Sequence, residues 1–152
     1  MRTILYASIS PDGGLHRAEG GHRIPPAILM DFLTTARETG NLIMGRGTFS
    51  LMPLPPELAD VDVVVLSRRR QELEGAHVAA SPAEALRHLE ALGHDTALLA
   101  GGAATYVAFV EEGLVDEIRL NLLSSGGAPV CPLRTRNLSD GTLQVAAAVG
   151  KD

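Results

Sequence analysis

The stretch that decides the fold is Thr96-Ala-Leu-Leu-Ala-Gly-Gly-Ala-Ala-Thr-Tyr-Val-Ala-Phe-Val-Glu-Glu-Gly113. An apolar run leads into a pair of glycines, and an amphipathic helix pattern follows without a gap. Gly101 and Gly102 carry no Cβ, so a ligand can lie against the main chain there. The first turn of the following helix presents unpaired N–H groups and the positive end of the helix dipole, which favour a phosphate. We therefore expect a strand, a ligand-binding corner and a helix.

Two upstream segments have the same organisation, namely Asn41-Leu-Ile-Met-Gly-Arg-Gly-Thr-Phe-Ser50 and Val61-Asp-Val-Val-Val-Leu-Ser-Arg-Arg-Arg70. In the first, Arg46 offers a planar fork of five donors and Thr48 offers a hydroxyl at a helix start. In the second, the β-branched run Val63–Leu66 is typical of a strand covered on both faces, and a serine and three arginines follow it. Ligands of open α/β sheets bind beyond the carboxyl ends of the strands. Three such ends together indicate a dinucleotide site.

Length and composition are compatible with one domain over residues 1–152, which would bury about 68–70% of its unfolded surface. The hydrophobic content of 45% excludes disorder, and the net charge of −5 argues against a nucleic-acid partner. Cys131 is the one cysteine, so no intramolecular disulfide can form, and we expect a small apolar side chain there. No apolar run approaches the roughly 18 residues that cross a bilayer, and no secretion signal is present, so we expect a cytoplasmic protein without a membrane partner.

Strands and helices alternate along the chain, which is the pattern of an α/β sheet. We expect strands over residues 3–9, 41–45, 63–66, 76–79, 96–100 and 117–123. Helices are expected to start at Pro25 or Pro26, at the capping box Ser81-Pro-Ala-Glu84, and after the glycine pair. Residues 10–23 predict a glycine-rich loop. In the tail, residues 123–129 predict a glycine-rich loop and only Thr142–Val149 predicts a strand.

Several motifs occur in the order and spacing of the dihydrofolate reductase-like superfamily: Met44-Gly-Arg-Gly-Thr-Phe-Ser50, Val64-Val-Leu-Ser-Arg68, Ala100-Gly-Gly-Ala103 and Leu114-Val-Asp-Glu-Ile-Arg-Leu120. The chain most resembles the branch that contains the reductase domain of riboflavin biosynthesis and its stand-alone relatives. The opening Ile4-Leu-Tyr-Ala-Ser-Ile-Ser-Pro-Asp-Gly-Gly14 also resembles that branch. The resemblance implies an NADPH-dependent reductase with a mostly parallel, twisted sheet flanked by helices.

The resemblance also implies where the cofactor binds. Thr48 would donate to the pyrophosphate, and the main chain of Ala7 would hold the nicotinamide carboxamide. Arg46, Ser67 and Arg68 would surround the adenosine ribose, where a 2′-phosphate needs charge and bidentate donors. The glycine pair and the alanine after it would let the pyrophosphate and the nicotinamide ribose approach the backbone. The complete expected cofactor site consists of Ala7, Gly45, Arg46, Thr48, Leu66, Ser67, Arg68, Gly101, Gly102, Ala103 and Thr105.

The substrate side departs from the family pattern. True dihydrofolate reductases place a carboxylate early in the first long helix. When Phe32 is matched to the helix aromatic of the family, that position falls on Ile28 or Ala27, and neither side chain can ionise. Asp31 comes about one turn later on a different side of the helix, where we expect a solvated residue. The expected substrate is therefore not folate but a small pyrimidine- or pteridine-like heterocycle that is reduced at C=N or C=O.

Reduction also needs a proton, for which the chain offers two catalytic candidates in the glycine-rich loop. Asp12 lies in the Ser-Pro-Asp-Gly turn, where it could equally bond its own backbone. His22 could supply a proton at neutral pH or lie on the surface. Water is the third source. The other histidines are too scattered in sequence to indicate a metal site.

Two further hypotheses stay open. One is a catalytically lapsed, nucleotide-binding scaffold of the same fold, and the other is an atypical dihydrofolate reductase. Riboflavin-branch relatives are typically dimers, and an unpaired C-terminal sheet edge would need covering, so we expect a homodimer. The zinc-ligand spacing of the companion deaminase is not in this sequence, and a strict riboflavin-pathway role would need a separately encoded partner.

Overall fold

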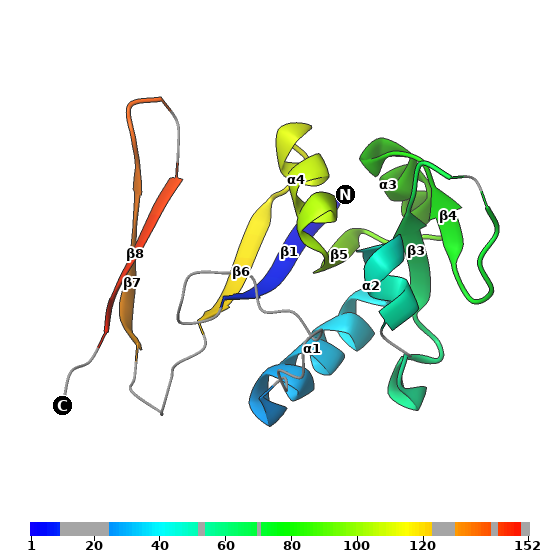
Figure 1. The fold of residues 1–152 in the computed structure, drawn as a ribbon, viewed down its shortest axis with the longest axis horizontal. Coiled ribbons are helices and arrows are strands. Elements are labelled where there is room, and N and C mark those ends of the chain that lie inside the picture. The colour runs from blue at the N-terminus through cyan, green and yellow to red at the C-terminus, as the bar shows by residue number, and fades with distance from the viewer. Residues whose placement is uncertain (10–24, 52–53, 70, 123–129, 141–142, 150–152) are drawn as a thin grey trace.

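The computed structural model describes residues 1–9, 25–51, 54–69, 71–122, 130–140 and 143–149. Within them the chain forms a six-stranded sheet with helices on both faces and a separate two-stranded hairpin (Figure 1). The strands are β1 (Arg2–Ile9), β2 (Asn41–Gly45), β3 (Asp62–Leu66), β4 (His77–Ala79), β5 (Thr96–Gly101), β6 (Glu117–Leu122), β7 (Val130–Asn137) and β8 (Leu143–Val149). The helices are α1 (Pro26–Thr39), α2 (Arg46–Leu51), the 3-10 turn η1 (Pro56–Leu58), α3 (Pro82–Ala91) and α4 (Ala103–Glu111).

The sheet has the strand order β4-β3-β2-β5-β1-β6, and all of its registered pairs are parallel. This confirms the expected α/β fold. One irregularity matters for the site. Ile43 of β2 lies opposite Leu99 of β5, but Met44 lies opposite Gly101, so the register shifts by one residue. The shift sets the glycine pair beside the carboxyl end of β2.

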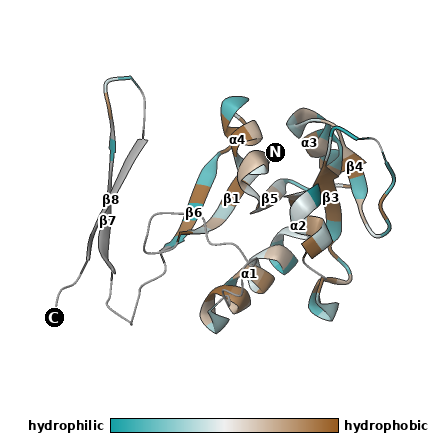
Figure 2. Ribbon diagram, viewed as in Figure 1, coloured by the Kyte–Doolittle hydropathy of each residue, from teal (hydrophilic) through white to brown (hydrophobic). Residues whose placement is uncertain are grey.

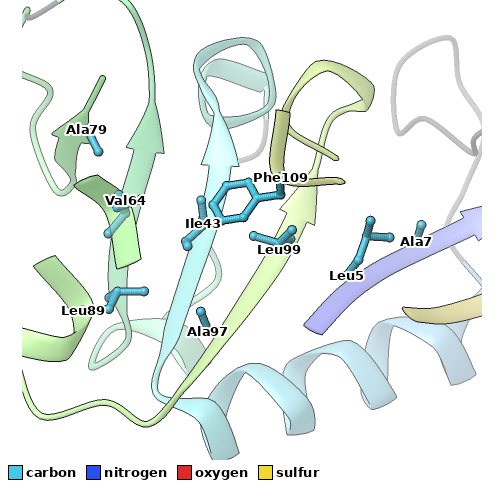
Figure 3. Close-up of a cluster of buried hydrophobic side chains, with 10 residues drawn as sticks. Leu5, Ala7, Ile43, Val64, Ala79, Leu89, Ala97, Leu99 and Phe109 are labelled. Carbon is cyan, nitrogen blue, oxygen red and sulfur yellow. The ribbon is translucent and has the colours of Figure 1, made fainter. Parts of the chain in front are cut away.

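Alternating side chains divide the core between the two faces of the sheet. On one face, Phe109 of α4 and Leu89 of α3 pack with strand residues such as Ile43 and Leu99 (Figure 3). On the other face, α1 and η1 cover a second buried cluster, which comprises Ile4, Tyr6, Ala36, Leu42, Met44, Leu58, Val63, Val65 and Leu98. The result is a three-layer arrangement. Figure 2 shows the matching distribution, with hydrophobic residues along β3 and hydrophilic and hydrophobic residues alternating along β6.

Local signals in the sequence explain where the elements begin and end. The Ser81 hydroxyl accepts a hydrogen bond from the Glu84 N–H at 3.2 Å, and the Glu84 carboxylate accepts one from the Ala80 N–H at 3.2 Å. Gly40 ends α1 with a φ of 74°, a left-handed conformation that favours glycine. The capping box and the helix stop therefore lie where the sequence predicts them.

Asn41 joins two neighbouring strands from inside the core. Its fully buried amide donates to the carbonyl oxygens of Thr96 at 2.7 Å and Thr39 at 3.0 Å. Its side-chain oxygen accepts a hydrogen bond from the Leu98 N–H at 3.1 Å. A buried polar group is stable only when it is paired, and this one is. Asn41 thereby fixes the start of β2 against β5.

The C-terminal segment corrects one expectation. The single predicted strand is present as β8, but β7 pairs with it to form an antiparallel hairpin. Pro132 argues against a strand here when the sequence is read alone, because proline cannot donate a hydrogen bond to a strand ladder. The pairing is interrupted between Cys131 and Arg134, on either side of that proline. In Figure 1 the hairpin lies beyond β6, and it forms a sheet of its own.

Candidate active site

A cleft of about 1220 Å³ lies across the carboxyl ends of β1, β2, β3 and β5. This exceeds the roughly 300–1,000 Å³ of ordinary small-molecule sites, so it has room for more than one ligand. Its lining includes every residue that the sequence suggested for cofactor binding, namely Ala7, Gly45, Arg46, Thr48, Leu66, Ser67, Arg68, Gly101, Gly102, Ala103 and Thr105. Strand ends that are far apart in sequence thus meet at one place.

The glycine corner at the centre of the cleft leaves little room for side chains at Gly45 and Gly102. The peptide bond between Gly101 and Gly102 is cis, and Gly101 has a φ of 130°. A Cβ added to Gly102 would lie 3.3 Å from the Thr48 hydroxyl oxygen, and a Cβ added to Gly45 would lie only 2.9 Å from the Thr105 hydroxyl oxygen. Backbone and small hydroxyl side chains therefore form a cradle that only glycines leave open. Such a cradle fits a pyrophosphate, which accepts hydrogen bonds from main-chain N–H groups and hydroxyls.

Cationic and hydroxyl groups gather at one end of the cleft. The Arg46 guanidinium donates to the Ser67 hydroxyl at 3.4 Å and to the Gln71 side-chain oxygen at 3.1 Å. The Ser67 oxygen also accepts a hydrogen bond from the Arg69 N–H at 3.2 Å, and Arg68 lines the cleft beside it. A planar guanidinium next to a hydroxyl and a second arginine has the donors that a phosphate monoester requires.

The other end of the cleft is apolar, and we call it the apolar half. It is formed by the end of β1, by α1, by the last residue of α2 and by the segment around η1. Its lining residues are Tyr6, Ser8, Ile28, Leu29, Phe32, Leu33, Leu51, Leu54, Pro55 and Leu58. The Tyr6 and Phe32 rings are 5.4 Å apart between centroids and tilted by 56°. An aromatic and aliphatic wall of this kind suits a flat ring compound.

The Asp31 carboxylate contacts the apolar half indirectly, through the Tyr6 side chain. The Tyr6 hydroxyl donates a hydrogen bond of 2.8 Å to the Asp31 carboxylate. Burial, and then the hydrogen bond to Asp31, raise the pKa of Tyr6 to about 12, so the phenol keeps its proton at neutral pH. Asp31 is exposed, as expected, but the prediction that it is only a solvated residue missed this bond. Of Ile28 and Ala27, the two helix positions at which the match to folate enzymes expects the acid, Ile28 lines the cleft.

Two of the predicted site residues remain to be placed. The catalytic candidates Asp12 and His22 lie outside the described residues. Among the described residues, no group of three or more His, Cys, Asp and Glu side chains could hold a metal ion. Likewise, no helix in that part of the chain has the length and apolar character needed to cross a bilayer. Sequence reasoning missed Tyr6 and Ser8, although their alternate positions in β1 place both on the face covered by α1.

The sequence profile described as dihydrofolate reductase matches residues 23–123, from just before α1 to just after β6. The chain belongs to the dihydrofolate reductase family. A solved structure with this fold is that of a protein from Shewanella sp. PV-4 that is provisionally assigned to riboflavin biosynthesis. The two chains are 19% identical, 99% of this chain and 100% of that chain are covered, and the TM-score is 0.62. No functionally curated protein matches this member of the family.

Proposed function

We propose that the protein is an NADPH-dependent reductase that transfers a hydride to a C=N or C=O bond of a small pyrimidine- or pteridine-like heterocycle. The observation that carries the proposal is the division of one cleft into three zones. Arg46, Ser67 and Arg68 lie at one end, the glycine corner lies at the centre, and an apolar half lies at the other end. A phosphorylated dinucleotide and a flat substrate need these zones in this order. Membership of a reductase family supports it.

The residues of the cleft fit this cofactor. The glycine corner and the Thr48 hydroxyl would hold the pyrophosphate, and the main chain of Ala7 would hold the nicotinamide carboxamide. Arg46, Ser67 and Arg68 would bind the 2′-phosphate, which favours NADPH over NADH. When bound, NADPH supplies the hydride. The protein's own task is then to orient the two ligands and to exclude water from the apolar half.

The substrate half argues for a heterocycle other than folate. A folate enzyme needs an acid on the cleft side of the first long helix, and Ile28 lines the cleft of this chain instead. The provisional role of the Shewanella protein in riboflavin biosynthesis supports a heterocycle from that chemistry. The proton would come from Asp12, His22 or water.

The test is a calorimetric titration of the purified protein with NADPH and with NADH. We expect micromolar binding of NADPH, and the Arg46→Ala variant should weaken it by about tenfold or more, because a hydrogen bond to a charged group is lost. NADH binding should change much less. Arg87→Ala, an exposed position of α3 outside the cleft lining, is the matched control and should bind NADPH like the wild type. If neither nucleotide binds, the reductase assignment fails.

A further inference from the structure

Side-chain hydrogen-bonding groups are sparse in the apolar half of the cleft. Among the described residues that line it, Tyr6 and Ser8 are the ones with polar side chains, and none is a lysine, arginine or histidine. The rest of that lining is aliphatic or aromatic. A ligand that carries a net charge would lose its hydration here without gaining a partner from these residues. Among the described lining residues of the apolar half, the Tyr6 hydroxyl is therefore the principal group that can orient a ligand.

Neighbouring atoms determine how the Tyr6 hydroxyl can bond. A hydroxyl has one proton and two lone pairs. The proton has two nearby acceptors, the Asp31 carboxylate at 2.8 Å and the Ile28 carbonyl oxygen at 3.5 Å. The shorter, charge-assisted bond is much the stronger, so the proton points at Asp31. With its proton held by Asp31, the hydroxyl offers a ligand only its lone pairs, so toward a ligand it can only accept.

We propose that the apolar half of the cleft selects an uncharged, flat ring compound that donates an N–H hydrogen bond to the Tyr6 hydroxyl, and that Asp31 is the positioning residue that keeps this hydroxyl an acceptor. This inference deepens the proposed function, on which it rests, because it names the chemistry of the substrate in the same site. Lactam and aminopyrimidine rings have the required N–H group. A ring with an oxygen in place of the N–H would set a lone pair of that oxygen against a lone pair of the Tyr6 hydroxyl, and the two would repel each other.

The test uses 2-quinolone and coumarin, two bicyclic rings of nearly equal shape. They differ in that coumarin has a ring oxygen where 2-quinolone has an N–H. Affinities are measured by fluorescence for the protein alone and for the protein saturated with NADP⁺. We expect wild type to bind 2-quinolone about tenfold more tightly than coumarin, the effect of one desolvated hydrogen bond. In Tyr6→Phe the ratio of the two affinities should fall to about one.

The Asp31→Ala variant separates positioning from simple support of the fold. Without the carboxylate, the Tyr6 proton becomes free to turn toward the ligand, so coumarin should gain affinity and the ratio should fall to about threefold or less. A purely structural role would weaken both ligands and leave the ratio unchanged. Glu38→Ala, an exposed position on the same helix, is the matched control and should keep the wild-type ratio. Circular dichroism melts verify that each variant is folded.

The outcomes distinguish this inference from the proposed function. A tenfold preference that depends on Tyr6 and Asp31 supports the inference even if NADP⁺ does not bind, in which case the reductase assignment alone fails. Equal wild-type affinities for the two rings overturn the inference, as does a ratio that Asp31→Ala leaves unchanged. Failure of both rings to bind at millimolar concentration also overturns it, whatever NADP⁺ does.

Discussion

The Tyr106 hydroxyl donates a hydrogen bond of 2.5 Å to the main-chain oxygen of Tyr6, from the first turn of α4 to β1. The registered pairing of β1 with β5 ends one residue earlier, at Leu5 opposite Leu99. The phenol therefore continues the connection where the strand ladder stops. Burial raises the pKa of Tyr106, so the hydroxyl remains a donor throughout the neutral range. Both tyrosines line the cleft, so this bond ties α4 to β1 within its wall.

Replacing Tyr106 with Phe should lower the free energy of unfolding by about 1–2 kcal/mol, because a part-buried carbonyl oxygen loses its donor. In the same variant the loss of binding free energy for NADPH should be smaller than the loss of unfolding free energy. Some loss is expected because the lost bond joins two residues of the cleft wall. Denaturant melts and calorimetry measure the two effects. Unchanged stability would mean that water replaces the phenol at no cost.

Gly45→Ala should destabilise the protein by about 1–3 kcal/mol, because the new Cβ would lie 2.9 Å from the Thr105 hydroxyl oxygen. The double variant Gly45→Ala/Thr105→Ala removes the clashing oxygen and should recover most of this loss. Thermal melts of the two single variants and the double variant give the coupling between the positions. Additive effects would show that the clash is relieved elsewhere.

Asn41→Ala should be among the most destabilising single changes in the sheet, by about 2–4 kcal/mol. It leaves the carbonyl oxygens of Thr96 and Thr39 and the N–H of Leu98 without their buried partner. Thr34→Ala, at an exposed position of α1 outside this network, serves as the control. Urea unfolding measures both. A loss below 1 kcal/mol for Asn41→Ala would contradict the role we assign to this amide.

Stability should fall between pH 7 and pH 5 partly because of a histidine pair. The His77 and His88 rings stack with centroids 3.5 Å apart and planes 3° apart. Burial, and then the charge of His77, lower the pKa of His88 from its ordinary 6.5, against the opposing effect of Asp62. Because protonation is disfavoured in the folded state, this contribution to stability is present above pH 6.5 and is lost as the pH falls through the lowered pKa.

The measurement is the Tm of wild type and of His88→Gln at half-unit pH steps from 8 to 5. His88→Gln should show the shallower decline, since it has no ring to protonate. The Asp62–His94 contact of 2.7 Å is common to both proteins and does not contribute to the difference between them. Parallel curves would contradict the prediction.

We also expect a homodimer in solution. In the described part of the chain, β6 is an edge of the six-stranded sheet, and open edges invite pairing with another chain. Light scattering should therefore give about twice the 16.0 kDa of one chain. A mass of one chain at all micromolar concentrations would reject the dimer.

Most of the sheet was predictable because its signals are local. The β-branched run that forms β3, the capping box at Ser81 and the stop at Gly40 each specify one element without help from the rest of the chain. Parallel strands carry their ligands at their carboxyl ends, so the residues after β2, β3 and β5 could be grouped into one site from the sequence. In the structure these residues line one cleft.

The parts that were missed depend on distant contacts. Nothing near Asp31 in the sequence indicates that its carboxylate meets the Tyr6 hydroxyl, because the bond joins α1 to β1 across the core face. The strand β7 was missed because Pro132 contradicts a strand locally, while the pairing with β8 tolerates it through an irregular register. In both cases tertiary structure outweighs a local rule.

The position of β1 between β5 and β6 also determines when this strand can fold during synthesis. Arg2 pairs with Thr96, and Ile4 pairs with Glu117, so β1 leaves the ribosome long before the strands on either side of it have been made. At ordinary translation rates this delay is on the order of ten seconds. During that time Ile4, Leu5 and Tyr6 have no strand on either side. The nascent chain therefore carries the apolar strand β1 without its partners during this interval, which favours aggregation.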